Sequence, residues 1–103
     1  MKRNIILFCA AGMSTSILVS RMKEAAHEKG LDYDVDSYAI SEADKKGPEA
    51  DIILLGPQVR YFLEDIKKKF PDKPVECVDM QAYGTLDGEK VINQIINMIE
   101  NKT

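Results

Sequence analysis

The apolar residues of the chain gather in short continuous runs and in one alternating stretch. Asn4 to Phe8 and Asp51 to Leu55 each hold four consecutive apolar residues, which is typical of strands covered on both faces of a parallel sheet. Val75 to Val78 predicts a further, shorter strand. Asp32 to Ser37 instead alternates, with all of its carboxylates on one face, and such a face predicts a strand at the edge of the sheet.

Between these strands, apolar residues recur every three or four positions, as on one face of a helix. This spacing predicts a helix from about Ser16 to Gly30 and a short one over Ser41 to Lys46. It predicts a third helix after Gly56-Pro57, ended by Pro71, and a last one from Asp87 or Gly88. The positions expected to face inward are Leu18, Met22, Ala25, Ala26, Val59, Phe62, Leu63, Ile66, Phe70, Val91, Ile92, Ile95, Ile96 and Ile99.

Strands that alternate with helices predict a single α/β domain over residues 1–103, with a four-stranded parallel open sheet and helices on both faces. If the acidic strand is an edge, the simplest strand order is 2-1-3-4. That order reverses between the first and third strands, so a crevice opens at their carboxyl ends, where open α/β sheets bind ligands. Cys9 borders this crevice on one side, and Leu55 to Gln58 borders it on the other.

The composition of the chain limits which cellular compartment and which classes of partner we expect. With 103 residues and 45% hydrophobic residues, the chain can build one core without disulfides or a structural metal. A net charge of -3 argues against nucleic acid as a partner, and no apolar run approaches the ~20 residues of a membrane helix. Cys9 and Cys77 have neither the spacing of a redox motif nor a set of histidines for a metal site, so we expect a reducing, cytoplasmic setting.

The loop after Cys9 is rich in small and hydroxylated residues and leads directly into a predicted helix. Such a loop leaves main-chain N–H groups unpaired at the positive end of the helix dipole, which makes a cradle for an anion. The same donors favour a thiolate, so Cys9 is a candidate nucleophile whose phosphorylated product would sit in the cradle. The predicted phosphate-binding residues are Ala10, Ala11, Gly12, Met13, Ser14, Thr15 and Ser16.

Other interpretations of this loop stay open. In the plainest interpretation, Cys9 is only a small buried residue and the serines only cap the helix. In another, the chain is a thiol enzyme like the low-molecular-weight tyrosine phosphatases and arsenate reductases, which carry C-x5-R after their first strand. The fifth residue after Cys9 is Thr15 instead of arginine, and a hydrolase needs that guanidinium more than a carrier does. A regulatory domain that senses phosphorylation is a third, non-enzymatic reading.

Three longer stretches are more specific than the loop alone: "LFCAAGMSTSILVSRM", "ADIILLGPQVRYFLEDI" and "KPVECVDMQAYGTLDG". In order and spacing they resemble the IIB component of the bacterial sugar phosphotransferase system, in its lactose and cellobiose or N,N'-diacetylchitobiose family. The single-domain cellobiose/chitobiose form is the most similar. The resemblance covers nearly the whole chain and implies a sheet like that of the low-molecular-weight tyrosine phosphatases.

The resemblance also implies a function and its partners. Cys9 would accept a phosphoryl group from the phosphohistidine of a IIA protein and pass it to a β-linked disaccharide bound by the membrane component IIC. We predict no metal and no cofactor, because the cradle itself would neutralise the charge. We expect a monomer in the cytoplasm that associates with the inner face of the membrane through IIC.

Both partners must reach the same phosphoryl group, so their footprints on this domain are expected to overlap. Met13, Pro57, Gln58 and Tyr83 are candidates for the rim of that interface, although ordinary loop packing explains each equally well.

Four more residues are considered for a functional role, and each also has a purely structural interpretation. His27 falls near the far end of the first helix and is expected at the surface. Cys77 is expected in the core, too far from Cys9 for a disulfide. Asp79 is either an acid near the site or a cap of the next turn, and Arg60 either docks a partner or is simply solvated.

Overall fold

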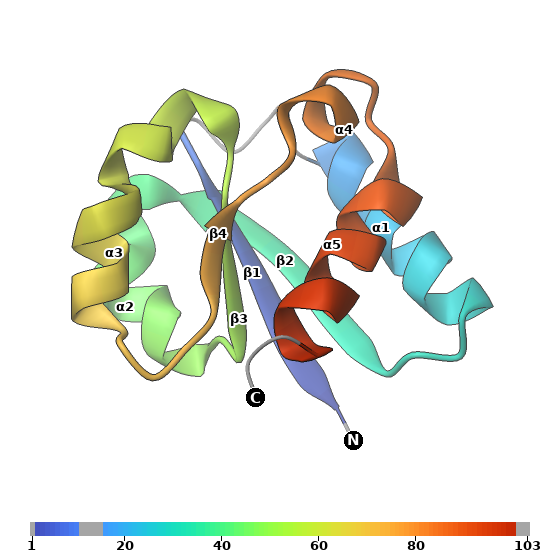
Figure 1. Cartoon of the computed structure of the whole chain (residues 1–103), viewed down its shortest axis with the longest axis horizontal. Coiled ribbons are helices and arrows are strands. Elements are labelled where there is room, and N and C mark those ends of the chain that lie inside the picture. The colour runs from blue at the N-terminus through green and yellow to red at the C-terminus, as the bar shows by residue number, and fades with distance from the viewer. Residues whose placement is uncertain (1, 11–15, 101–103) are drawn as a thin grey trace.

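The computed structural model describes residues 2–10 and 16–100, which form one parallel sheet with helices on both faces (Figure 1). The strand order is β2-β1-β3-β4, and all three pairings are parallel. Both the fold class and the 2-1-3-4 order predicted from the sequence are therefore confirmed. The strands are β1 (Arg3–Cys9), β2 (Tyr33–Ala39), β3 (Ile52–Leu55) and β4 (Val75–Cys77).

The helical segments connect the strands and close the chain. Three of them are short 3-10 turns. The α-helices are α1 (Ser16–Glu28), α2 (Ala43–Lys46), α3 (Leu63–Lys69), α4 (Met80–Gly84) and α5 (Gly88–Glu100), and the 3-10 turns are η1 (Ile40–Glu42), η2 (Gly47–Glu49) and η3 (Pro57–Phe62).

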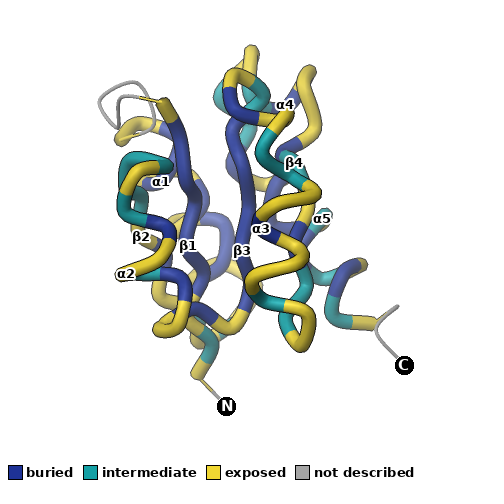
Figure 2. Tube along the Cα trace, turned by 90° about the vertical axis from the view of Figure 1, so that its left-hand side faces the viewer, coloured by how far each residue is buried: buried dark blue, intermediate teal, exposed yellow. Residues whose placement is uncertain are grey.

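The sheet separates two hydrophobic cores, because side chains alternate between its faces along each strand. Ile5 and Leu7 of β1 point into the core under α1 and α5. Ile6 and Phe8 point into the core under α2 and α3. Figure 2 shows the central strands as the most deeply buried part of the trace, which is why their sequences read as continuous apolar runs.

The acidic strand β2 lies at the edge of the sheet, as predicted. Val35 is buried, whereas Asp34 and Asp36 on either side of it are exposed. The Lys2 ammonium lies 3.0 Å from the Asp34 carboxylate, and this hydrogen bond raises the pKa of Lys2. Charged side chains along this edge discourage pairing with another strand.

Three details differ from the sequence predictions. The turn after Gly56 is 3-10 instead of α-helical up to Phe62, because the Val59 amide bonds back to the Gly56 carbonyl at 3.0 Å and Val59 leaves helical geometry. Helix α4 was not predicted. In α5 the core positions belong to Val91, Ile92, Ile95 and Met98, whereas Ile96 and Ile99 are only partly buried at the flanks.

Because all strands are parallel, they all end at one edge of the sheet and all begin at the opposite edge, so these two edges differ. Every strand ends at the edge where α1, η3 and α4 begin (the top of Figure 1). Arg3, the first residue of β1, and the end of α5 lie at the opposite edge.

Candidate active site

Cys9 is the last residue of β1, one of the two strands between which the order reverses. Its side chain is 2% exposed. The Cys9 thiol donates a hydrogen bond to the main-chain carbonyl of Tyr38 on β2, with 3.7 Å between sulfur and oxygen. The strand thus delivers the thiol to the carboxyl edge of the sheet, as the sequence predicts.

The predicted anion cradle falls largely outside the described residues. The cradle residues that the structure does not describe are Ala11, Gly12, Met13, Ser14 and Thr15. Their role as phosphate-binding residues therefore stays a prediction. The residues on either side are described: Ala10 is exposed, and Ser16 is the exposed first residue of α1. The amino end of a 13-residue helix therefore lies at the same edge as Cys9, where its dipole favours an anion.

The segments that follow β3 and β4 lie at the same edge as the end of β1 and contact one another. The Gly56 amide donates to the Phe8 carbonyl at 2.8 Å, so this segment is tied to the residue before Cys9. The Gln58 side-chain amide donates to the Tyr83 hydroxyl at 3.0 Å. Two of the predicted interface residues thus contact one another, while Pro57 lies half-buried beside them.

Helix α4 is held in place by polar contacts, of which the sequence analysis anticipated only the cap by Asp79 and not the contacts of Gln94. Asp79 caps it by accepting a hydrogen bond from the Ala82 amide at 2.9 Å. Gln94 of α5 donates to the Cys77 carbonyl at 2.8 Å and accepts from the Asp79 amide at 3.0 Å. The plainer reading of Asp79, as a cap, is the one confirmed. Asp79 could have indicated the start of this helix from the sequence, since Asp is a favoured N-cap.

The remaining candidates lie apart from the thiol. His27 is exposed in the last turn of α1. Cys77 is half-buried in β4, less deeply than expected. Burial raises the pKa of the Cys77 thiol, and the positive charges of Arg60 and Lys67 oppose that rise. No three His, Cys, Asp or Glu side chains within residues 2–10 and 16–100 converge into a possible metal site.

Residues 4–94 match the family model described as "PTS system, Lactose/Cellobiose specific IIB subunit". The chain belongs to this family. IIB subunits are the sugar-specific phosphoryl carriers of the phosphotransferase system, and they work with IIA proteins and membrane IIC components. Membership favours a phosphotransferase over the phosphatase considered from the loop alone.

Relatives with assigned sugars support the family over nearly the full length of the chain. The galactose-specific EIIB component of Lactococcus lactis subsp. cremoris is 39% identical over 92% of this chain and 94% of its own length. The oligo-beta-mannoside-specific EIIB component of Bacillus subtilis is 34% identical over 97% of this chain and 99% of its own length.

Solved structures confirm the fold of the IIB subunit. The cellobiose-specific phosphotransferase IIB protein of Borrelia burgdorferi superposes with a TM-score of 0.80 at 34% identity, covering 100% of this chain and 96% of that one. The lactose-specific IIB domain of Streptococcus pneumoniae shares the fold, with a TM-score of 0.80 at 19% identity over 95% of this chain and 98% of that one.

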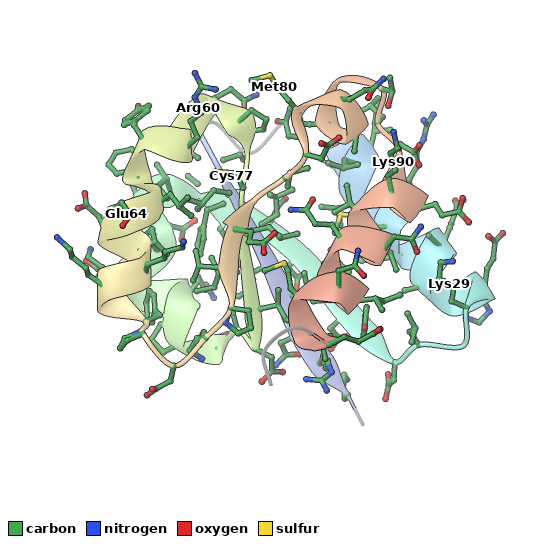
Figure 3. The ribbon with its side chains drawn as sticks, in the orientation of Figure 1. Lys29, Arg60, Glu64, Cys77, Met80 and Lys90 are labelled. Carbon is green, nitrogen blue, oxygen red and sulfur yellow. The ribbon has the colours of Figure 1, made fainter. Side chains whose placement is uncertain are left out.

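The edge of the IIB subunit that holds Cys9 also carries large exposed apolar side chains. Among the described residues, Ile17, Tyr61 and Met80 are 54%, 74% and 60% exposed. Each belongs to a segment that begins where a strand ends: α1, η3 and α4. Figure 3 shows Met80 and Arg60 together along this edge, above Cys77. Periodicity alone could not reveal these residues, because an exposed apolar residue looks the same in sequence as a buried one.

Proposed function

We propose that Cys9 of this IIB subunit is the residue that carries the phosphoryl group. The single observation that supports it is the place of Cys9, which ends β1 at the reversal of strand order beside the amino end of α1. Ligands of open α/β sheets bind at this point, and the helix end stabilises negative charge there.

The first transfer moves the phosphoryl group from a IIA phosphohistidine to sulfur. The Cys9 thiolate attacks phosphorus in line with the bond to the histidine nitrogen, the S–P bond forms, and the N–P bond breaks with its electron pair on nitrogen. Catalysis of such a step is mostly positioning and charge stabilisation. The loop from Ala10 to Ser16 and the amino end of α1 supply the donors for the equatorial oxygens.

The second transfer passes the group to a sugar held by IIC. A sugar hydroxyl attacks phosphorus, the S–P bond breaks, and the Cys9 thiolate leaves. The base for that hydroxyl belongs to IIC, because the only histidine of the chain, His27, lies about 16 Å along α1 from its first turn.

The partner surface is the carboxyl edge around Cys9. Ile17, Tyr61 and Met80 are exposed and belong to the three segments that begin at this edge, and exposed large apolar side chains are a feature of interaction surfaces. Met13, Pro57, Gln58 and Tyr83 remain the proposed rim. Both partners use this one edge in turn, so each contact is small and exchangeable.

We assign the sugar to the β-linked disaccharides of the cellobiose or chitobiose type. The relatives named for cellobiose and for oligo-beta-mannoside support this class, whereas the relative named for galactose, a monosaccharide, does not. No helix in the described part of the chain has the length and apolar character of a membrane span. We place the protein in the cytoplasm as a monomer, bound to the inner face of the membrane through IIC.

Incubation with a phosphorylated IIA protein, followed by intact-mass measurement, tests the proposal. One phosphate should be added to the wild type and to Cys77→Ala, and none to Cys9→Ala. A phosphate that appears on Cys9→Ala overturns the assignment. Release of inorganic phosphate from an aryl phosphate at enzymatic rates would instead favour the phosphatase class.

A further inference from the structure

Gln58 and Tyr83 join two segments that follow neighbouring strands. Gln58 lies in η3 after β3, and Tyr83 lies in α4 after β4. Their side chains meet in a hydrogen bond of 3.0 Å, donated by the Gln58 amide to the Tyr83 hydroxyl. Gln58 is exposed, whereas Tyr83 is partly buried against the core beneath α1 and α5. The bond therefore fastens a surface turn to an anchored ring.

The pair lies against Gly56, whose amide is bonded to Phe8, the residue before Cys9. A Cβ placed on Gly56 would lie 2.8 Å from Gln58 Oε1, 3.6 Å from the Tyr83 ring and 3.6 Å from the Phe8 carbonyl. The missing side chain of Gly56 is thus what lets the Gln58 amide fold back over the end of the sheet. Because Phe8 precedes Cys9, the pair lies beside the end of β1 on its β3 side, while the Cys9 thiol itself is bonded to Tyr38 on the β2 side.

Both ends of the bond are fixed independently of it. The Gly56 amide is bonded to Phe8, and α4 is capped by Asp79, whose amide is bonded to Gln94. Loss of the bond would therefore separate two segments that each stay anchored, without unfolding either of them.

We propose that Gln58 and Tyr83 are a positioning pair that closes the β3 side of the site and protects the phosphoryl group on Cys9 from water. This inference rests on the proposed function, since it presupposes phosphocysteine. In the reaction that the pair suppresses, water oxygen bonds to phosphorus and the S–P bond breaks with its electron pair on sulfur. Inorganic phosphate leaves, and one proton from water restores the thiol.

The half-life of the isolated phosphoprotein tests this role. Wild type, Tyr83→Phe, Gln58→Leu and the double variant are phosphorylated by IIA, freed of the donor, and followed by intact mass. Each single variant should lose phosphate about three to ten times faster, the range expected for one hydrogen bond. The double variant should be no faster than the singles, because both remove the same bond.

Matched variants separate this role from docking and from folding. Tyr33→Phe, at the start of β2, and Gln81→Leu change residues of the same types outside the pair and should leave the half-life unchanged. Thermal unfolding should show all variants folded at the assay temperature. Unchanged half-lives in the single variants, or additive effects in the double variant, overturn the inference while the proposed function stands. Absence of phosphate on wild-type Cys9 overturns the proposed function itself.

Discussion

The Cys9 thiol donates a hydrogen bond across the sheet to the Tyr38 carbonyl, 3.7 Å away. A phosphorylated sulfur has no proton to donate, so the bond must be lost each time the carrier is loaded. The Tyr38 carbonyl shares its peptide group with the Ala39 amide, and we expect the ¹⁵N resonance of Ala39 to shift on phosphorylation. Two-dimensional NMR of the protein before and after loading measures this shift.

A variant without the donor checks the cause of that shift. Cys9→Ala should move the Ala39 resonance in the same direction without any phosphate, while the Val35 amide near the start of β2 stays in place. An Ala39 resonance that is unaffected by both changes would rule out the bond in solution.

Asp79 offers a test between a structural and a catalytic carboxylate. Because its side chain caps α4, Asp79→Ala should lower the free energy of unfolding by about 1 kcal/mol, whereas Asp79→Asn, an equally good cap, should change it little. Urea denaturation measures both. Phosphoryl transfer to Cys9 should survive in Asp79→Asn, and its loss there would argue for a chemical role.

Gly88 lies where α5 packs directly against the main chain of α1. A Cβ at this position would lie 2.6 Å from both the Arg21 carbonyl oxygen and the Met22 amide nitrogen, which are main-chain atoms that cannot turn aside. We expect Gly88→Ala to destabilise the protein by about 1–3 kcal/mol. Gly84→Ala is the matched control, since nothing lies within 4 Å of its Cβ. Equal melting temperatures for the two variants would contradict the packing.

Stability should fall at alkaline pH partly because of Cys77. Burial raises the pKa of this thiol above its ordinary value of 9.0, so the unfolded chain releases the proton at a lower pH than the folded one. The stabilisation is complete below the unfolded pKa and is lost as pH rises through the folded one.

Cys77→Ala isolates this contribution. Its free energy of unfolding should decline less than that of the wild type between about pH 8 and pH 10. Tyr33, whose pKa burial also raises, affects both proteins alike. Parallel curves would show that Cys77 makes no contribution.

The sheet was predictable because its signals are local and strong. The exposed carboxylates of Asp34 and Asp36 on one face of β2 are tolerated only at an edge, and this edge position led to the predicted strand order and the place of Cys9. Helix α4 escaped prediction because Met80–Gly84 is five residues long, too short for a hydrophobic period to appear.

The site was less predictable than the fold. The place of Cys9 follows from the end of a strand, but the bond between Gln58 and Tyr83 joins residues 25 positions apart. Such a pairing depends on how two loops are aimed by the whole sheet. The exposure of Tyr61 and Met80 has the same origin, because only the folded chain decides which apolar side chains stay exposed to solvent.

The two unlike edges of the sheet also matter for how the protein is handled. A tag or a fused domain joined near Arg3 or beyond α5 would emerge on the side away from the thiol. The domain can therefore be immobilised or linked in tandem by either end while its reactive edge stays open to partners.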